Sequence, residues 1–78
     1  MKFVNKGRKI DTEVHRRFGQ VLEQGGYSTY TAADMLGISR PAVQTYVDGS
    51  RKITIDMAAK ICKTFDIDYV WFITGLKL

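Results

Sequence analysis

Two side chains that can bind the edges of nucleic-acid bases lie four residues apart in one short segment. Arg40 carries a guanidinium fork that matches the O6 and N7 acceptors of guanine, and Gln44 carries a carboxamide that matches adenine. Four residues is one helical turn, so both share a face if the segment is helical. Thr45 follows Gln44, and the apolar Pro41 and Ala42 suit contact with a thymine methyl group. The alternative for Arg40 is a contact with a backbone phosphate.

Residues that commonly carry catalysis or bind metals are scarce. His15 is the only histidine, and it is expected on an exposed helical face beside two arginines. Cys62 is the only cysteine, which excludes an intramolecular disulfide and a thiolate cluster for zinc. It falls among apolar residues at helical spacing, as a small core residue does. There is no glycine-rich phosphate loop, so we expect no enzyme, no metal, no cofactor and no small-molecule ligand.

Two short predicted helices and a tight turn would position the candidate base-binding residues. Ser28 is the preferred cap of a helix over residues 29–36. Gly37 supplies the left-handed conformation that ends it, and Ser39 caps a second helix over residues 40–47. Two helices joined by a glycine-containing turn are how small proteins present the second helix to the major groove of DNA.

Three further helices are predicted from apolar residues that recur every three or four positions. The first begins near Asp11 or Thr12 and ends at Gly25-Gly26, the fourth follows Thr54, and the last runs over residues 69–74 between Asp68 and Gly75. Their apolar faces contain Val14, Phe18, Val21 and Leu22 in the first helix, and Ile55, Ala58, Ile61, Cys62 and Phe65 in the fourth. Five helices and no convincing strand predict a compact all-α domain.

The positive charge is concentrated at the N-terminus of the 78-residue chain. Residues 1–17 carry six basic and two acidic side chains, which accounts for the whole net charge of +4. Residues 1–10 lack helical periodicity, so we expect a basic arm, with room for an extended piece at Phe3–Val4, before a domain over residues 11–78. Such an arm suits a polyanion partner, and a solubilising tail is the alternative.

The complete run of residues resembles the lambda-repressor/Cro-like helix-turn-helix family, also called the xenobiotic-response-element type. The resemblance covers residues 12–75. It rests on Ser28, Ala33, Leu36-Gly37-Ile38-Ser39, Val43, Tyr46 and Gly49, and continues in Arg51-Lys52, Lys60-Ile61-Cys62 and Trp71-Phe72-Ile73-Thr74-Gly75. The chain departs from the family pattern at Thr29, Pro41, Val47-Asp48 and Ile53.

The resemblance implies a transcriptional regulator that binds double-stranded operator DNA as a homodimer. Its helix over residues 40–47 would enter the major groove, and the small size favours a repressor similar to phage Cro. The alternative is a protein-interaction module or antitoxin-like regulator on the same scaffold, with a protein partner. We expect such a protein in the cytoplasm of a bacterial or phage-infected cell, associated with the nucleoid and not with a membrane.

Contacts to the DNA backbone are expected from the start of the second helix, the basic loop after the third helix, and the arm. The candidates are Ser28, Thr29, Tyr30, Ser39, Arg51, Lys52, Lys6, Arg8 and Lys9. The last helix is unusually apolar for its length. We expect part of it, Trp71 and Phe72 with Leu76 and Leu78, to form the dimer surface, and the alternative is that all of it is core.

Overall fold

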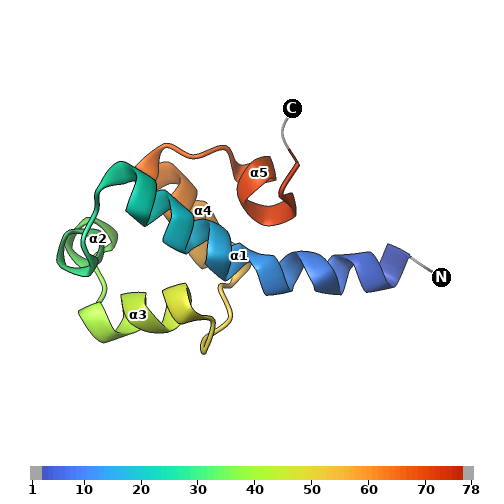
Figure 1. Ribbon diagram of the computed structural model, residues 1–78, viewed down its shortest axis with the longest axis horizontal. Coiled ribbons are helices and arrows are strands. Elements are labelled where there is room, and N and C mark those ends of the chain that lie inside the picture. The colour runs from blue at the N-terminus through green and yellow to red at the C-terminus, as the bar shows by residue number, and fades with distance from the viewer. Residues whose placement is uncertain (1–2, 77–78) are drawn as a thin grey trace.

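Five helices make up the fold in the computed structural model, which describes the backbone of residues 3–76 and the side chains of residues 13–76. They are α1 (Phe3–Gly25), α2 (Thr29–Leu36), α3 (Arg40–Asp48), α4 (Ile55–Phe65) and α5 (Tyr69–Thr74). Helix α1 packs against α3 and α5, α2 packs against α3 and α4, and α4 packs against α5 (Figure 1). There is no strand within residues 3–76, which confirms the predicted all-α fold.

The core takes one large side chain from every helix. The largest fully buried side chains are Phe18, Leu36, Val43, Ile61 and Phe72. The predicted apolar faces are therefore correct in outline, although Val21 is only half-buried and Ile55 lies outside the core. Ile55 is 74% exposed, because it is the first residue of α4 and lies beyond the edge of the core.

Local capping sets the helix boundaries, as the sequence predicts. Ser28 Oγ accepts from the amide of Thr31, and Thr54 Oγ1 and Asp68 Oδ2 accept from amides in the first turns of α4 and α5. Gly37 ends α2 with φ of 70°, a left-handed conformation that costs glycine little. Helices α2 and α5 have the predicted bounds, and α3 is one residue longer than predicted.

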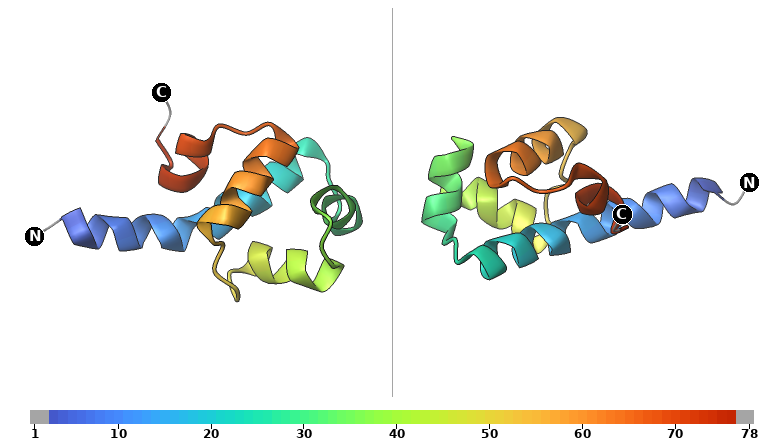
Figure 2. Two further views of the ribbon diagram at one scale, coloured as in Figure 1. Left: turned by 180° about the vertical axis from the view of Figure 1, so that it is seen from behind. Right: turned by 90° about the horizontal axis from the view of Figure 1, so that it is seen from above.

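The start of α1 differs from the prediction. The helix begins at Phe3 and not near Asp11 or Thr12, so the extended piece expected at Phe3–Val4 is wrong. Its N-terminal half projects beyond the other four helices, on the side away from α2 (Figures 1 and 2). Gly7 disfavours a helix by only about 1 kcal/mol relative to alanine, whereas the surrounding lysines and arginines are good helix formers.

No helix in the described part of the chain combines the length and apolar character that crossing a bilayer requires.

Candidate nucleic-acid interface

Helices α2 and α3 form the predicted pair, and both begin with a serine cap. Ser39 Oγ accepts from the amide of Ala42 at 3.2 Å, and Ser28 Oγ accepts from the amide of Thr31 at 3.1 Å. The turn between the helices is held by the amide of Ile38, which donates to the carbonyl of Ala33. These bonds begin both helices and close the turn between them.

The first turn of α2 leaves backbone amides that an anion can bind. The first hydrogen bond along the helix runs from Ala32 N to Ser28 O, and the Ser28 hydroxyl satisfies Thr31 N. The amides of Thr29 and Tyr30 precede these bonds and point out of the helix end. A phosphate at this position would meet both amides and the positive end of the helix dipole.

Arg40 lies at the start of α3 and stacks on an aromatic ring from α2. Its guanidinium carbon is 3.9 Å from the centre of the Tyr30 ring. Both side chains are exposed, so the pair stands on the surface that the two helices share. The family resemblance predicts that Tyr30 contacts the DNA backbone, and nothing in its spacing from Arg40 indicates the stack.

The other residues predicted to contact bases differ in what they present to solvent. Pro41 and Gln44 are exposed on α3. Thr45 is half-buried, and its hydroxyl donates to the carbonyl of Ala42 at 2.7 Å within the helix. Arg40 and Gln44 therefore carry the polar groups that face outward.

The end of α3 is fixed by the side chain of Asp48. The amide and the hydroxyl of Ser50 both donate to Asp48 Oδ1, at 2.8 and 2.6 Å. These bonds, with a smaller effect from nearby His15, lower the pKa of the Asp48 carboxyl. The carboxylate therefore stabilises the turn that ends α3.

The basic loop follows this turn. The amide of Arg51 donates to the carbonyl of Thr45 at 3.2 Å, and its guanidinium lies 5.5 Å from the centre of the Tyr46 ring. Arg51 and Lys52 are both exposed and adjoin the C-terminal end of α3. The predicted contact of these two cations with the DNA backbone stays a prediction.

His15 connects α1 to the end of α3. It is half-buried and not exposed as predicted, since its ring lies against Gly49. A side-chain carbon added at Gly49 would approach the His15 ring to 3.0 Å. This contact is part of the packing of α1 against α3.

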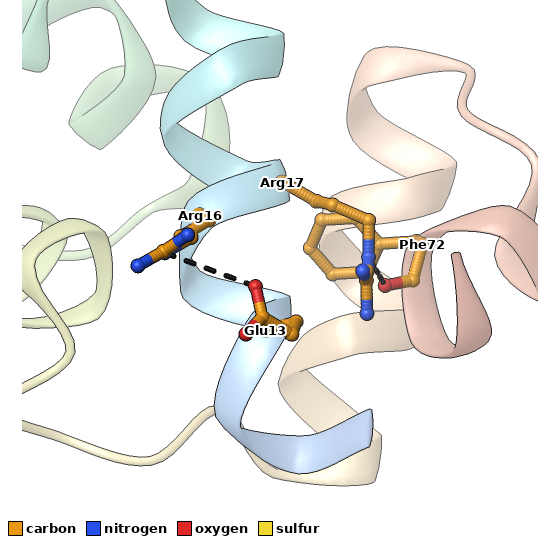
Figure 3. A network of polar contacts seen from close by, with 4 residues as sticks. All are labelled: Glu13, Arg16, Arg17 and Phe72. Carbon is orange, nitrogen blue, oxygen red and sulfur yellow. Dashed lines mark hydrogen bonds and ion pairs between the residues drawn. The ribbon is translucent and has the colours of Figure 1, made fainter. Parts of the chain in front are cut away.

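Arg17 has a structural role that the sequence did not indicate. Its Nε donates to the carbonyl of Phe72 at 2.6 Å and its Nη2 donates to the carbonyl of Ile73 at 3.1 Å (Figure 3). Partial burial lowers the pKa of Arg17, and the charge of Glu13 opposes that shift. Arg17 caps the end of α5 and does not belong with the cations free to meet DNA.

Arg16 points away from this cap. It is exposed, and its Nε lies 3.8 Å from a carboxylate oxygen of Glu13 on the same helix (Figure 3). The predicted contacts Lys6, Arg8 and Lys9 fall outside the side chains that the structure describes.

The proposed dimer residues divide between core and surface. Phe72 is fully buried, so placing it on the dimer surface is wrong: its ring completes the core. Trp71 is half-buried and packs against that core, whereas Leu76 is 64% exposed. Tyr69 and Val70 are the other exposed apolar residues of this region. Leu78 lies outside the described residues.

Cys62 is buried in α4, as its apolar neighbours predict. Burial raises the pKa of its thiol to about 11, and the charge of Asp68 adds to the shift. The thiol is therefore protonated at neutral pH and is a poor nucleophile.

Comparison with known proteins supports the same architecture. A helix-turn-helix family model matches residues 19–72. A protein of Pyrococcus furiosus is 41% identical over 58 residues, which are 74% of this chain and 18% of that protein. A protein of Pyrococcus abyssi is 34% identical over 62 residues, which are 80% of this chain and 20% of that protein.

Both relatives carry the provisional name of HTH-type transcriptional regulatory protein, and this chain spans about a fifth of their length. No solved structure matches the chain at a significant level. The family match includes all of α2, α3 and α4, together with the turn and the basic loop between them. The chain thus belongs to the lambda-repressor/Cro-like helix-turn-helix family of DNA-binding transcriptional regulators.

Proposed function

We propose that this protein binds operator DNA sequence-specifically through α3 in the major groove and acts as a repressor of Cro type. The observation that carries the proposal is the two-sided character of α3. Val43 and Tyr46 are buried on one side, while Arg40, Pro41 and Gln44 are exposed on the other. The exposed side carries hydrogen-bonding groups suited to guanine and adenine, and it is free of contacts to the core.

Electrostatics require that much of the affinity come from outside α3. Helices α2 and α3 together carry one cation, Arg40, against Asp34 and Asp48. Phosphate contacts supply most of the non-specific affinity for DNA. We assign these contacts to the first amides of α2, to Arg51 and Lys52, and to the basic residues at the start of α1.

A second copy of the chain would add both affinity and specificity. A dimer of helix-turn-helix domains reads two half-sites about 34 Å apart. We propose a homodimer that uses Trp71 and Leu76, joined by Tyr69 and Val70, because these residues leave an apolar surface on α5 and just after it. In this proposal the protein works without a cofactor or catalytic chemistry, in the cytoplasm, on the DNA of the nucleoid.

The same apolar surface supports a second candidate function. Exposed Tyr69, Val70 and Leu76 would equally suit a protein partner, as in an antitoxin-like regulator. The two functions are separated by whether the purified protein alone prefers one DNA sequence over another.

Selection of bound sequences from a random DNA pool, followed by gel shifts, tests the proposal. Arg40→Glu should weaken binding to the selected site by more than about tenfold, because it removes a bidentate contact worth about 1–3 kcal/mol and adds repulsion. Lys63→Glu is the matched control: it makes the same charge change at an exposed position near the end of α4, outside the α2–α3 pair. If the wild-type protein shows no preference for the selected site over competitor DNA, the protein-interaction module becomes the favoured function.

A further inference from the structure

Tyr30 is an aromatic side chain that the core does not need. It is 64% exposed, although it stands on a short helix whose other face is buried. The centre of its ring lies 3.9 Å from the guanidinium carbon of Arg40, close enough for the faces of the two groups to stack. The pair joins α2 to α3 across the outside of the turn.

Arg40 occupies a position that is electrostatically unfavourable for a cation. The N-terminus of a helix carries partial positive charge, and the first turn of α3 has no acidic residue. Among the side chains of residues 13–76, the one ion pair joins Arg16 to Glu13, so no carboxylate there pairs with Arg40. The negative face of the Tyr30 ring is therefore the group that stabilises this guanidinium in its observed position.

Stacking leaves the N–H groups of a guanidinium free, whereas an ion pair occupies them. A carboxylate partner would occupy the N–H groups at the edge of the guanidinium. An aromatic ring contacts the flat face instead, and all five N–H donors in the plane stay available. Two of these donors are what a guanine edge requires, at O6 and N7.

We propose that Tyr30 is a positioning residue for base recognition: its ring holds the Arg40 guanidinium flat and ready to bind guanine in the major groove. The proposal rests on the proposed DNA-binding function and gives Tyr30 a role other than a phosphate contact. It makes the guanine preference of the site depend on a residue of α2 that itself touches no base.

The test compares Tyr30→Phe, which keeps the ring, with Tyr30→Leu, which removes it. Binding is measured to the selected site, to the same site with 7-deazaguanine in place of each guanine, and to random DNA. Tyr30→Leu should weaken binding to the selected site about two- to fivefold, in proportion to a cation–π contact, and should leave binding to random DNA unchanged. Tyr30→Phe should bind all three DNAs as wild type does.

A double-mutant cycle with Arg40→Ala completes the test. If Tyr30 acts through Arg40, Tyr30→Leu has no further effect in the Arg40→Ala protein, and the penalty for 7-deazaguanine shrinks in both variants. Equal losses for Tyr30→Phe and Tyr30→Leu would assign Tyr30 a phosphate contact through its hydroxyl and overturn the proposal. Additive losses would also overturn the proposal. So would a selected site at which 7-deazaguanine weakens binding equally in the wild-type and Arg40→Ala proteins.

Failure of this proposal is distinguishable from failure of the proposed function. Wild-type protein that shows no sequence preference overturns both. A wild-type protein that discriminates, with a Tyr30→Leu variant that discriminates equally well, overturns the positioning role alone. Proton chemical shifts of the Arg40 side chain in the free protein provide a check without DNA: the upfield shift from the ring should persist in Tyr30→Phe and disappear in Tyr30→Leu.

Discussion

Individual side chains decide which of the cations in this protein are free to meet DNA. Arg17 belongs by sequence to the basic N-terminal region, yet its guanidinium binds two carbonyls at the end of α5. Arg16, the next residue, is exposed and pairs only loosely with Glu13. The two adjacent arginines therefore have different roles: Arg17 stabilises the fold, and Arg16 lies at the surface.

Arg17→Met should destabilise the protein, whereas Arg16→Met should not. The first change leaves the carbonyls of Phe72 and Ile73 without their charged donor, which we expect to lower the free energy of unfolding by about 1–2 kcal/mol after allowance for partial exposure. The second removes an exposed pair and should change stability by less than about 0.5 kcal/mol. Urea unfolding of both variants measures the difference. Equal stabilities would show that the Arg17 contacts do not stabilise the fold.

At the same scale, the sequence predicts local contacts and misses distant ones. Ser28, Ser39 and Asp68 cap helices by bonds to amides three residues away, so their type and position are sufficient to predict them. Arg17 reaches carbonyls 55 and 56 residues further along the chain, and no local rule contains that information. The Tyr30–Arg40 stack depends in the same way on the angle between two helices.

Among the elements, the C-terminal end of α3 is held from two sides. Within the chain, Asp48 accepts two bonds from Ser50. From α1, the His15 ring packs against Gly49, which has φ of 84° and therefore a conformation that other residues rarely adopt. The C-terminal end of α3 thus also contacts α1.

Gly49→Ala should cost more stability than Gly37→Ala. Both replace a left-handed glycine, at a cost of about 1–2 kcal/mol, but the added carbon meets nothing within 4 Å at Gly37 and meets the His15 ring at 3.0 Å at Gly49. We expect an extra loss of about 1 kcal/mol for Gly49→Ala from this crowding. In a His15→Ala background the two substitutions should cost the same, as judged by thermal unfolding. If Gly49→Ala remains the costlier change there, crowding by His15 is not the cause.

The bounds of α1 show where element prediction fails. A helix over residues 12–25 follows from Val14, Phe18 and Leu22, which meet the core. Residues 3–11 offer no comparable pattern, and the structure still continues the helix through them. Their helical state reflects the propensity of single residues and continuity with a helix already formed, and neither produces a periodic signal.

At the scale of the whole molecule, the form of the N-terminal region limits how it can meet DNA. A helix is about 10 Å across, which exceeds the roughly 6 Å width of the minor groove. The helical start of α1 therefore cannot enter that groove as an extended arm can. Contact along the phosphate backbone remains, and it would add to the contacts proposed for Arg51 and Lys52 after the C-terminal end of α3.

Removing the basic charge of this region should flatten the salt dependence of DNA binding. Lys6→Gln, Arg8→Gln and Lys9→Gln in one protein retain good helix formers and remove three charges. If all three neutralise phosphates, the slope of log K against log salt should fall in magnitude by about 2.7, since each contact contributes about 0.9. Lys60→Gln with Lys63→Gln, on α4, is the control for lower net charge and should leave the slope unchanged. An unchanged slope in the triple variant would make the region a solubilising extension and shift the phosphate contacts to the loop after α3.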